Sequence, residues 1–240
     1  MKYLCDPQII PTVVPADFAN LESTAGLVTA YADWLHVDIA DGQFAPNTTW
    51  PLKDSTQLSE LERIRTELPK ISLEVHLMIA DPTEFGARCA RAGFKRIAAH
   101  LESFESGAAA RTALRAWKEA GATEAGIALK VGTPLALVDE VVDACDFVHL
   151  MSISEIGTQG LPYDDAALSR VEEIHAKYPD LMVAVDGGIS EATVEQFVRA
   201  GANRMCVGTA LAQSEDPAKT YARIHERAMM GCNPAASVAV

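Results

Sequence analysis

Short apolar runs rich in Val, Ile and Leu alternate with longer amphipathic segments along the whole chain. The short runs have the length of buried strands, and the longer segments have the helical period of apolar positions. Eight strands are predicted, at residues 9–14, 34–38, 72–78, 96–100, 124–129, 146–151, 181–185 and 203–207. Helices are predicted between the strands and after the last one, at residues 17–30, 58–68, 83–92, 104–120, 135–142, 164–177, 191–200 and 217–229.

This regular alternation predicts the fold class. Strands that read as continuous apolar runs are typical of a parallel sheet covered by helices on both faces or all round. Eight strand–helix units within 240 residues fit an α/β protein of the closed (β/α)8 TIM-barrel type. The alternative is an open doubly wound sheet, but no GxGxxG fingerprint follows the first predicted strand. We therefore predict a single barrel domain over residues 1–230 and a loose tail at 231–240.

Composition narrows the classes of partner. Lys+Arg number 20 against 33 for Asp+Glu, and the net charge of -13 argues against nucleic acid or an anionic membrane as partner. A small anionic substrate is still compatible, because backbone N–H groups can bind phosphate. The five cysteines form no CxxC pair, so a disulfide-stapled secreted domain is not expected and a cytoplasmic location is predicted. The first residues carry no signal-peptide pattern, and no apolar run is long enough to span a bilayer.

Polar side chains gather where the predicted strands end. In a (β/α)8 barrel the active site lies at these carboxyl ends. His36 and Asp38 are two residues apart, so on a strand both point to the same side. A charge inside a strand is costly unless it is paired or bound to a metal. His76 and Asp186 occupy corresponding places on the third and seventh strands.

Five segments match, in order and spacing, the ribulose-phosphate 3-epimerase family, which the chain resembles over nearly all of residues 8–218. They read HVDIADGQFAPN, EVHLMIADP, AAHLE, VDGGIS and GANRMCVGTAL. The resemblance implies a (β/α)8 barrel of the ribulose-phosphate-binding type and one divalent metal cation. It also implies reversible inversion at C3 of a ketose phosphate, with D-ribulose 5-phosphate and D-xylulose 5-phosphate as the first choice.

Carried over residue by residue, the resemblance makes His36, Asp38, His76 and Asp186 the metal ligands. Asp38 and Asp186 would also be the two catalytic acid/base groups. The residue chemistry agrees, since two imidazoles and two carboxylates suit Zn²⁺, Fe²⁺, Mn²⁺ or Co²⁺, and the choice among them stays open. Epimerisation beside a carbonyl removes a proton from one face and returns it on the other, through an enediolate that a metal can stabilise.

Substrate contacts are expected around the same strand ends. Backbone amides of the loops after strands six, seven and eight would hold the phosphate, which requires no lysine and suits an acidic chain. The residues predicted to bind the phosphorylated ketose are Thr12, His76, Met151, Gly157, Gly160, Gly187, Gly188, Gly208 and Thr209. We also expect a homo-oligomer.

Two departures from the family pattern leave alternatives open. The segment Ser154–Gly160 has two glycines where the usual Asn-Pro-Gly-Phe-Gly-Gly-Gln has three, and it adds Glu155, while Ala40 replaces a methionine. A hexulose 6-phosphate, such as allulose 6-phosphate, is therefore an alternative substrate. Lys130 at the end of strand five raises a second alternative, a Schiff-base aldolase or lyase. A third is a sugar-phosphate binder without catalysis, because Glu155 would repel phosphate if it faced inward.

Overall fold

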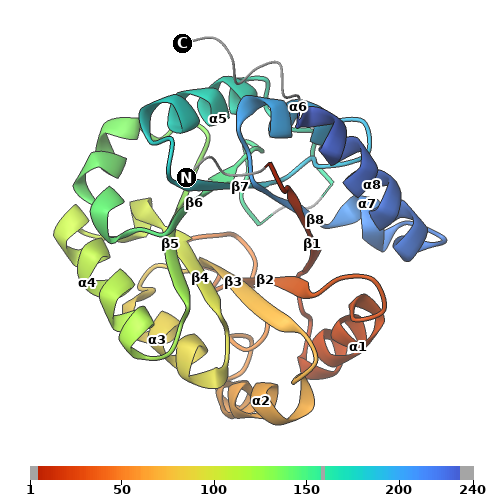
Figure 1. The fold of residues 1–240 in the computed structure, drawn as a ribbon. Coiled ribbons are helices and arrows are strands. Elements are labelled where there is room, and N and C mark those ends of the chain that lie inside the picture. Colours follow the sequence, from red (N-terminus) through yellow and green to blue (C-terminus); the bar gives the residue numbers. More distant parts are fainter. Residues whose placement is uncertain (1–4, 158–159, 233–240) are drawn as a thin grey trace.

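The computed structural model describes residues 5–157 and 160–232 as a closed barrel of parallel strands (Figure 1). Each strand pairs with the next one along the chain, and the register of β1 with β8 closes the ring. This confirms the predicted (β/α)8 TIM barrel. The strands are β1 (Gln8–Val13), β2 (Trp34–Ala40), β3 (Ser72–Met78), β4 (Arg96–His100), β5 (Glu124–Leu129), β6 (Phe147–Met151), β7 (Met182–Asp186) and β8 (Arg204–Val207).

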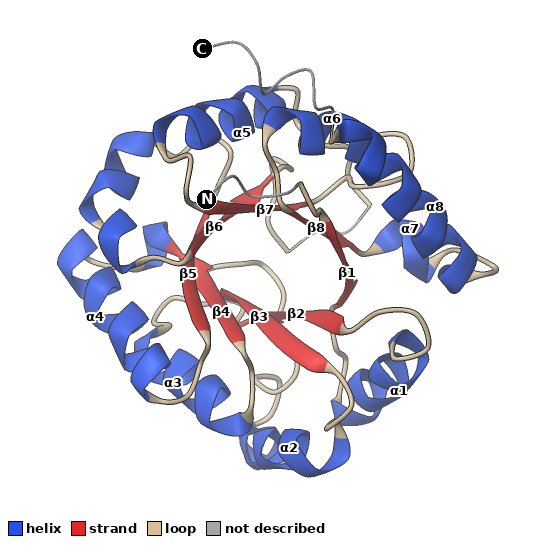
Figure 2. Cartoon of the chain, in the orientation of Figure 1, coloured by secondary structure: helices blue, strands red, loops and turns tan. Residues whose placement is uncertain are grey.

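Helices surround the barrel on its outside (Figure 2). The α-helices are α1 (Phe18–Val28), α2 (Ile64–Glu67), α3 (Thr83–Ala92), α4 (Gly107–Glu119), α5 (Ala166–Lys177), α6 (Val194–Ala200), α7 (Thr209–Ala212) and α8 (Pro217–Gly231). The described residues also form four 3₁₀ helices, η1 (Ser55–Arg63), η2 (Leu101–Ser103), η3 (Leu135–Glu140) and η4 (Val142–Ala144). Within the described residues, no helix has both the length and the apolar character needed to cross a membrane.

Two predicted helices differ in type from the observed ones. Residues 135–142 form 3₁₀ turns instead of an α-helix, and most of residues 58–68 belong to η1 before the short α2. Val138, Val141 and Val142 are β-branched, which lowers their α-helical propensity, and 3₁₀ turns are common in short connectors. The four-residue α7 was not predicted, because so short a segment has no periodic pattern.

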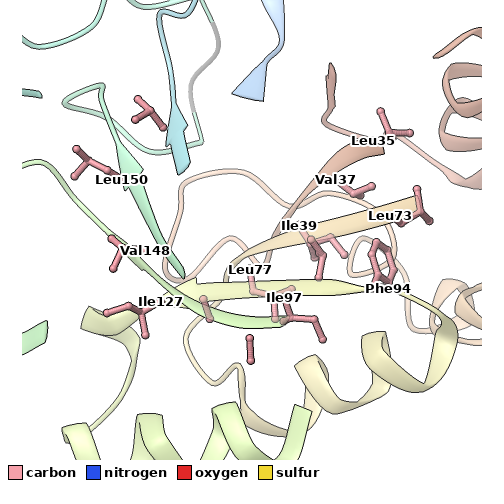
Figure 3. Packing of buried hydrophobic residues seen from close by; sticks show 14 of the residues in the cluster. Leu35, Val37, Ile39, Leu73, Leu77, Phe94, Ile97, Ile127, Val148 and Leu150 are labelled. Atoms are coloured by element: carbon pink, nitrogen blue, oxygen red, sulfur yellow. The ribbon is translucent and has the colours of Figure 1, made fainter. Parts of the chain in front are cut away.

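Alternate residues of each strand face two different environments. Leu35, Val37 and Ile39 of β2 pack in the apolar layer between the sheet and the helices, together with Leu73 and Leu77 of β3 (Figure 3). The residues between them face the barrel interior, where polar and small side chains gather. The interior positions that carry charge or imidazole are His36, Asp38, Glu74, His76, Arg96, His100, Glu124, His149, Asp186 and Arg204.

A disulfide joins the two ends of the described chain, contrary to the expectation from sequence. Cys5 precedes β1 and Cys232 follows α8, and their Cα atoms are 5.6 Å apart in the bonded pair. A separation of 227 residues leaves no local signal in the sequence, because only closure of the barrel brings these ends together.

Helix α8 continues through Gly231, so the predicted tail loses its first two residues to ordered structure. Residues 233–240 lie outside the described part.

Candidate metal centre and substrate cavity

Three histidines and an aspartate from four strands converge inside the barrel. The side chains of His36, His76, His149 and Asp186 each offer a donor atom, and these atoms all lie within 4.8 Å of one another. Asp38 joins them through Oδ1, which is 3.3 Å from His36 Nε2 and 3.0 Å from His76 Nδ1. The structure therefore brings together all four residues predicted as metal ligands, and it adds His149.

Strand register explains the convergence. Residues two apart on a strand point to the same face, which aligns His36 with Asp38 and His149 with Met151. Asp38 pairs with His76 across β2 and β3, and Met151 pairs with Asp186 across β6 and β7. The two halves of the site are thus set by sheet hydrogen bonding on opposite sides of the barrel.

Glu74 orients the first histidine from below. Its Oε1 is 2.7 Å from His36 Nδ1, and its Oε2 accepts a hydrogen bond from Arg96 Nη1 at 3.2 Å. Burial alone would raise the pKa of Glu74, but His36 and the nearby arginines hold it at about 2, so Glu74 is a carboxylate. Because the Glu74 carboxylate holds Nδ1, the Nε2 atom of His36 points toward Asp38 and Asp186. Metal-bound imidazoles are commonly held in this way, by a carboxylate on the ring nitrogen that does not bind the metal.

A hydrogen-bonded chain orients the second histidine. His76 Nε2 is 3.0 Å from His100 Nε2, and His100 Nδ1 is 3.2 Å from Glu102 Oε2. Burial raises the pKa of Glu102, but His100 and Thr133 outweigh burial and lower it to about 2. A carboxylate only accepts, so His100 donates from Nδ1 and accepts from His76 at Nε2. The free lone pair of His76 is therefore on Nδ1.

The resulting lone pairs face one another, which fits a cation. Burial raises the pKa of Asp38, but contacts with His36 and His76 hold it well below its usual range. Burial and the nearby His149 lower the pKa of His76, so this ring is neutral. The Nδ1 lone pair of His76 then faces the Asp38 carboxylate at 3.0 Å. His36 Nε2 has no hydrogen-bond partner among the described residues. A divalent cation satisfies all of these donor atoms at once.

A cavity of about 670 Å³ opens above these residues at the carboxyl ends of the strands. Asp38 and Asp186 both line it. So do eight of the nine residues predicted to bind substrate, namely Thr12, Met151, Gly157, Gly160, Gly187, Gly188, Gly208 and Thr209. His76, predicted to contact the substrate as well, is fully buried and is not among the residues that line the cavity.

Two glycines shape the turn after β7. Gly187 has φ 110° and Gly188 has φ 62°, a region that other residues rarely adopt. A Cβ on Gly188 would lie 2.6 Å from the backbone nitrogen of Tyr163. The Ser152 hydroxyl donates to the carbonyl of Asp186 at 2.9 Å and ties this turn to the end of β6. The turn therefore needs glycine both for its conformation and for space.

The segment after β6 packs through apolar side chains. Ile153 and Ile156 are buried in a small cluster with Ala40, Ala45, Met78 and Met151. Asn47 Nδ2 donates to the Gly157 carbonyl at 2.5 Å and joins this segment to the loop after β2. Glu155 is exposed and is not among the residues that line the cavity. Its charge therefore does not face the expected phosphate. Residues 158 and 159 of the segment lie outside the described part.

Lys130 lies at the rim and not in the cavity wall. Its side chain is exposed, and Nζ lies 4.7 Å from the centre of the Phe44 ring. A Schiff-base lysine is activated by burial or by a neighbouring cation, and burial is lacking here. The geometry thus argues against the aldolase alternative.

His149 and Glu74 were not predicted from the sequence, because neither was singled out inside its strand. Both lie one layer deeper in the barrel, two residues before Met151 and His76 respectively. The sequence does indicate their orientation, because inward-facing positions of a strand repeat every second residue. The same rule applied down each strand would have placed both of them inside.

Known proteins resemble the chain over most of its length. A model of the Ribulose-phosphate 3 epimerase family matches residues 8–212. Ribulose-phosphate 3-epimerase of Mycobacterium bovis is 34% identical over 226 residues, covering 92% of this chain and 93% of that protein. The enzyme of the same name from Schizosaccharomyces pombe is 32% identical, covering 92% and 94%.

Solved structures show the same fold at low sequence identity. The structure of 3-hexulose-6-phosphate synthase from Salmonella typhimurium has a TM-score of 0.70 at 16% identity, covering 93% of this chain and 99% of that chain. The structure of 3-keto-L-gulonate-6-phosphate decarboxylase from Vibrio cholerae has a TM-score of 0.68 at 16% identity, covering 93% and 98%. At these identities the likeness concerns the barrel alone.

Proposed function

Because the chain belongs to the ribulose-phosphate 3-epimerase family, we propose that it interconverts D-ribulose 5-phosphate and D-xylulose 5-phosphate by inversion at C3. Family membership makes the chain an isomerase acting on carbohydrates. The observation that carries the mechanism is the pair of carboxylates, Asp38 and Asp186, on opposite sides of one cavity.

The two carboxylates serve as proton carriers. Asp38 lies on β2 and Asp186 on β7, with β1 and β8 between them around the ring. A flat intermediate placed between two such groups can lose a proton to one and regain a proton from the other on the opposite face. The reverse reaction uses the same groups in exchanged roles. Inversion at C3 follows from this opposition and not from either residue alone.

We propose that His36, Asp38, His76 and Asp186 hold one divalent cation. Their converging lone pairs support this, together with the unpartnered Nε2 of His36. When bound, the cation would act as a Lewis acid that stabilises the negative charge of the enediolate. Glu74 and His100 hold the two imidazoles in the required orientation. The set accommodates Zn²⁺, Fe²⁺, Mn²⁺ or Co²⁺.

The phosphate is proposed to sit at the other end of the cavity. Gly187, Gly188, Gly208 and Thr209 line that wall at the ends of β7 and β8, where barrels of this fold commonly bind phosphate. Backbone amides would supply the hydrogen bonds without fixed positive charge. Thr12 lines the cavity and has a buried hydroxyl with no hydrogen-bond partner among the described residues, which supports a hydrogen bond to a sugar hydroxyl.

The test is C3 inversion in heavy water, with deuterium incorporation followed by NMR. Asp38→Asn and Asp186→Asn should each slow inversion of D-ribulose 5-phosphate by about 10²–10⁴-fold. Asp180→Asn removes the same charge from an exposed position and serves as the control. Inversion at the unmodified rate in either active-site variant would sink the two-carboxylate mechanism.

A hexulose 6-phosphate is the second candidate substrate. Ala40 lines the cavity with the smallest chiral side chain, which leaves room beside the sugar carbons. Comparing kcat/KM for D-ribulose 5-phosphate and allulose 6-phosphate decides between the two. A preference for the hexulose of more than about tenfold, or about 1.4 kcal/mol, would transfer the proposal to the longer sugar.

Assembly and location remain proposals. We propose a homo-oligomer, supported by exposed apolar side chains such as Leu27 and Met230, 69% and 57% exposed. Light scattering on the purified protein measures the subunit number. We also propose no nucleic-acid or membrane partner, in keeping with the net charge of -13. A cytoplasmic location is proposed because one relative, from Oryza sativa, is named as a cytoplasmic isoform. Fractionation of the native host tests the location.

A further inference from the structure

We propose that His149 is a fifth protein ligand of the metal, so that three imidazoles and two carboxylates surround the cation. This rests on the metal site of the proposed function and extends it by one residue. Neither the motif segments nor the strand-end positions include His149.

The position of the ring meets the geometric requirement. His149 Nε2 is 3.5 Å from Asp186 Oδ2, and all donor atoms of His36, His76, His149 and Asp186 lie within 4.8 Å of one another. Two ligands on one cation at about 2.1 Å each are separated by about 3–4 Å, depending on the angle between them. The observed spacing needs only small side-chain adjustments to reach this range.

The environment of His149 leaves its nitrogen without another use. The residue is 1% exposed, and Nε2 has no hydrogen-bond partner among the described residues. Its ring stacks on His36 with centroids 5.1 Å apart and planes 8° apart, and its centroid is 4.5 Å from that of His76. Buried polar atoms in folded proteins are nearly always partnered. Here the Nε2 atoms of His36 and His149 are both left free beside the same carboxylate.

His100 shows what a histidine with a supporting role looks like in this barrel. It is as deeply buried as His149, yet both of its nitrogens are engaged, Nε2 with His76 and Nδ1 with Glu102. His149 differs in the feature that matters for ligation, a free nitrogen directed toward other donor atoms. Packing alone therefore does not account for an imidazole at this position.

A fifth ligand also limits the choice of metal. Tetrahedral zinc sites use four ligands, whereas octahedral sites take six. Five protein ligands would exceed the four of a tetrahedral site. The set thus favours cations that readily adopt six-coordination, such as Fe²⁺, Mn²⁺ and Co²⁺, over tetrahedral Zn²⁺.

The experiment is X-ray absorption spectroscopy of the Co²⁺-loaded protein, which counts the imidazoles bound to the metal. We expect three imidazoles in the unmodified protein and two in His149→Leu. Phe147→Leu changes another inward-facing side chain of the same strand and should retain three. Competition with a chelator should show Co²⁺ affinity lower by about 10–100-fold in His149→Leu, at least the loss that follows removal of an outer-shell partner.

The outcomes separate this proposal from the proposed function. Two imidazoles and equal Co²⁺ affinity in the unmodified protein and His149→Leu would overturn the role of His149 while leaving the four-ligand site intact. Failure of the unmodified protein to bind Co²⁺ would overturn both. If His149→Leu does not fold, His149→Gln retains a polar side chain of similar length, and the expected imidazole count of two is the same.

Discussion

Two layers of ionisable side chains lie inside the barrel, and they differ in how their charges are balanced. The lower layer, made of Glu74, Arg96, Glu124 and Arg204, pairs with itself. Arg96 contacts Glu74 at 3.2 Å and Glu124 at 2.9 Å, and Arg204 contacts Glu124 at 2.7 Å. The two arginines thus balance the charge of the two glutamates, and no further ion is needed. Such a layer serves the fold.

The upper layer, made of His36, Asp38, His76, His149 and Asp186, has no such balance. It contains two carboxylates and no lysine or arginine, and the donor atoms of His36, His76, His149 and Asp186 converge on one point. Buried acceptors that converge in this way call for a cation from solution. Glu74 belongs to the lower layer but also contacts His36. The charge-balanced lower layer therefore positions a residue of the upper layer. The comparison teaches that charge balance separates a structural layer from a binding layer.

Breaking the lower layer should have the largest effect on stability. Arg96→Met removes this partner from the buried Glu74 and the half-buried Glu124, which should lower the free energy of unfolding by about 3–5 kcal/mol. Urea unfolding of the metal-free protein measures it. Arg91→Met breaks the exposed contact with Glu84 and should cost less than about 1 kcal/mol. Equal effects in the two variants would contradict the assigned role of the lower layer.

Binding of a divalent cation should stabilise the upper layer. At a free Co²⁺ concentration 100 times its Kd, the free energy of unfolding should rise by about 2.7 kcal/mol, because the metal binds only the folded state. Excess EDTA should reverse the gain. Asp38→Asn, at the same Co²⁺ concentration, should gain markedly less. A melting temperature independent of Co²⁺ in the unmodified protein would count against the binding role of this layer.

The pH dependence of stability tests the role of Glu102, which supports the upper layer through His100. Its folded-state pKa of about 2 lies below the usual value of 4.5, so its stabilising contribution is full above about pH 4.5 and is lost as pH falls toward about 2. Glu102→Gln should therefore be less stable than the unmodified protein at neutral pH. Between about pH 5 and pH 3 it should lose less stability, as measured by urea unfolding. Parallel pH curves for the two proteins would refute this role.

The smallest effect is expected outside both layers, at Glu155. Its side chain is exposed and away from the cavity wall, so Glu155→Ala should change the unfolding free energy by no more than about 0.5 kcal/mol. KM for D-ribulose 5-phosphate should stay within about twofold, since less than about 0.5 kcal/mol of binding is at stake. A KM several-fold lower in the variant would indicate that Glu155 does face the phosphate during turnover.

The barrel was predictable because its signal is repeated. Ser72–Met78 and Arg96–His100 were predicted with their observed bounds, since buried strands are continuous apolar runs between polar turns. The 3₁₀ segments were not predicted, because η3 carries the same apolar spacing as an α-helix and differs only in hydrogen bonding. The Cys5–Cys232 bond depends on closure of the whole fold, which no local pattern records.

Most residues of the candidate site could be predicted from motif segments, and His149 could not. Asp38, His76 and Asp186 stand in motif segments at strand ends, where chemistry is expected. His149 lies inside a strand that reads as apolar, and its importance appears only when β6 is placed opposite β2. Glu155 gave the reverse error, because its charge suggested a conflict with phosphate that its exposed orientation removes.

The central claim is that the upper layer needs a divalent cation for C3 chemistry. The most direct measurement is the rate of C3 deuterium exchange in D-ribulose 5-phosphate as Co²⁺ is titrated into EDTA-treated, dialysed protein. We predict exchange that is negligible without metal and rises in proportion to bound Co²⁺ up to one ion per chain. Full exchange in protein shown by elemental analysis to lack metal would contradict the account.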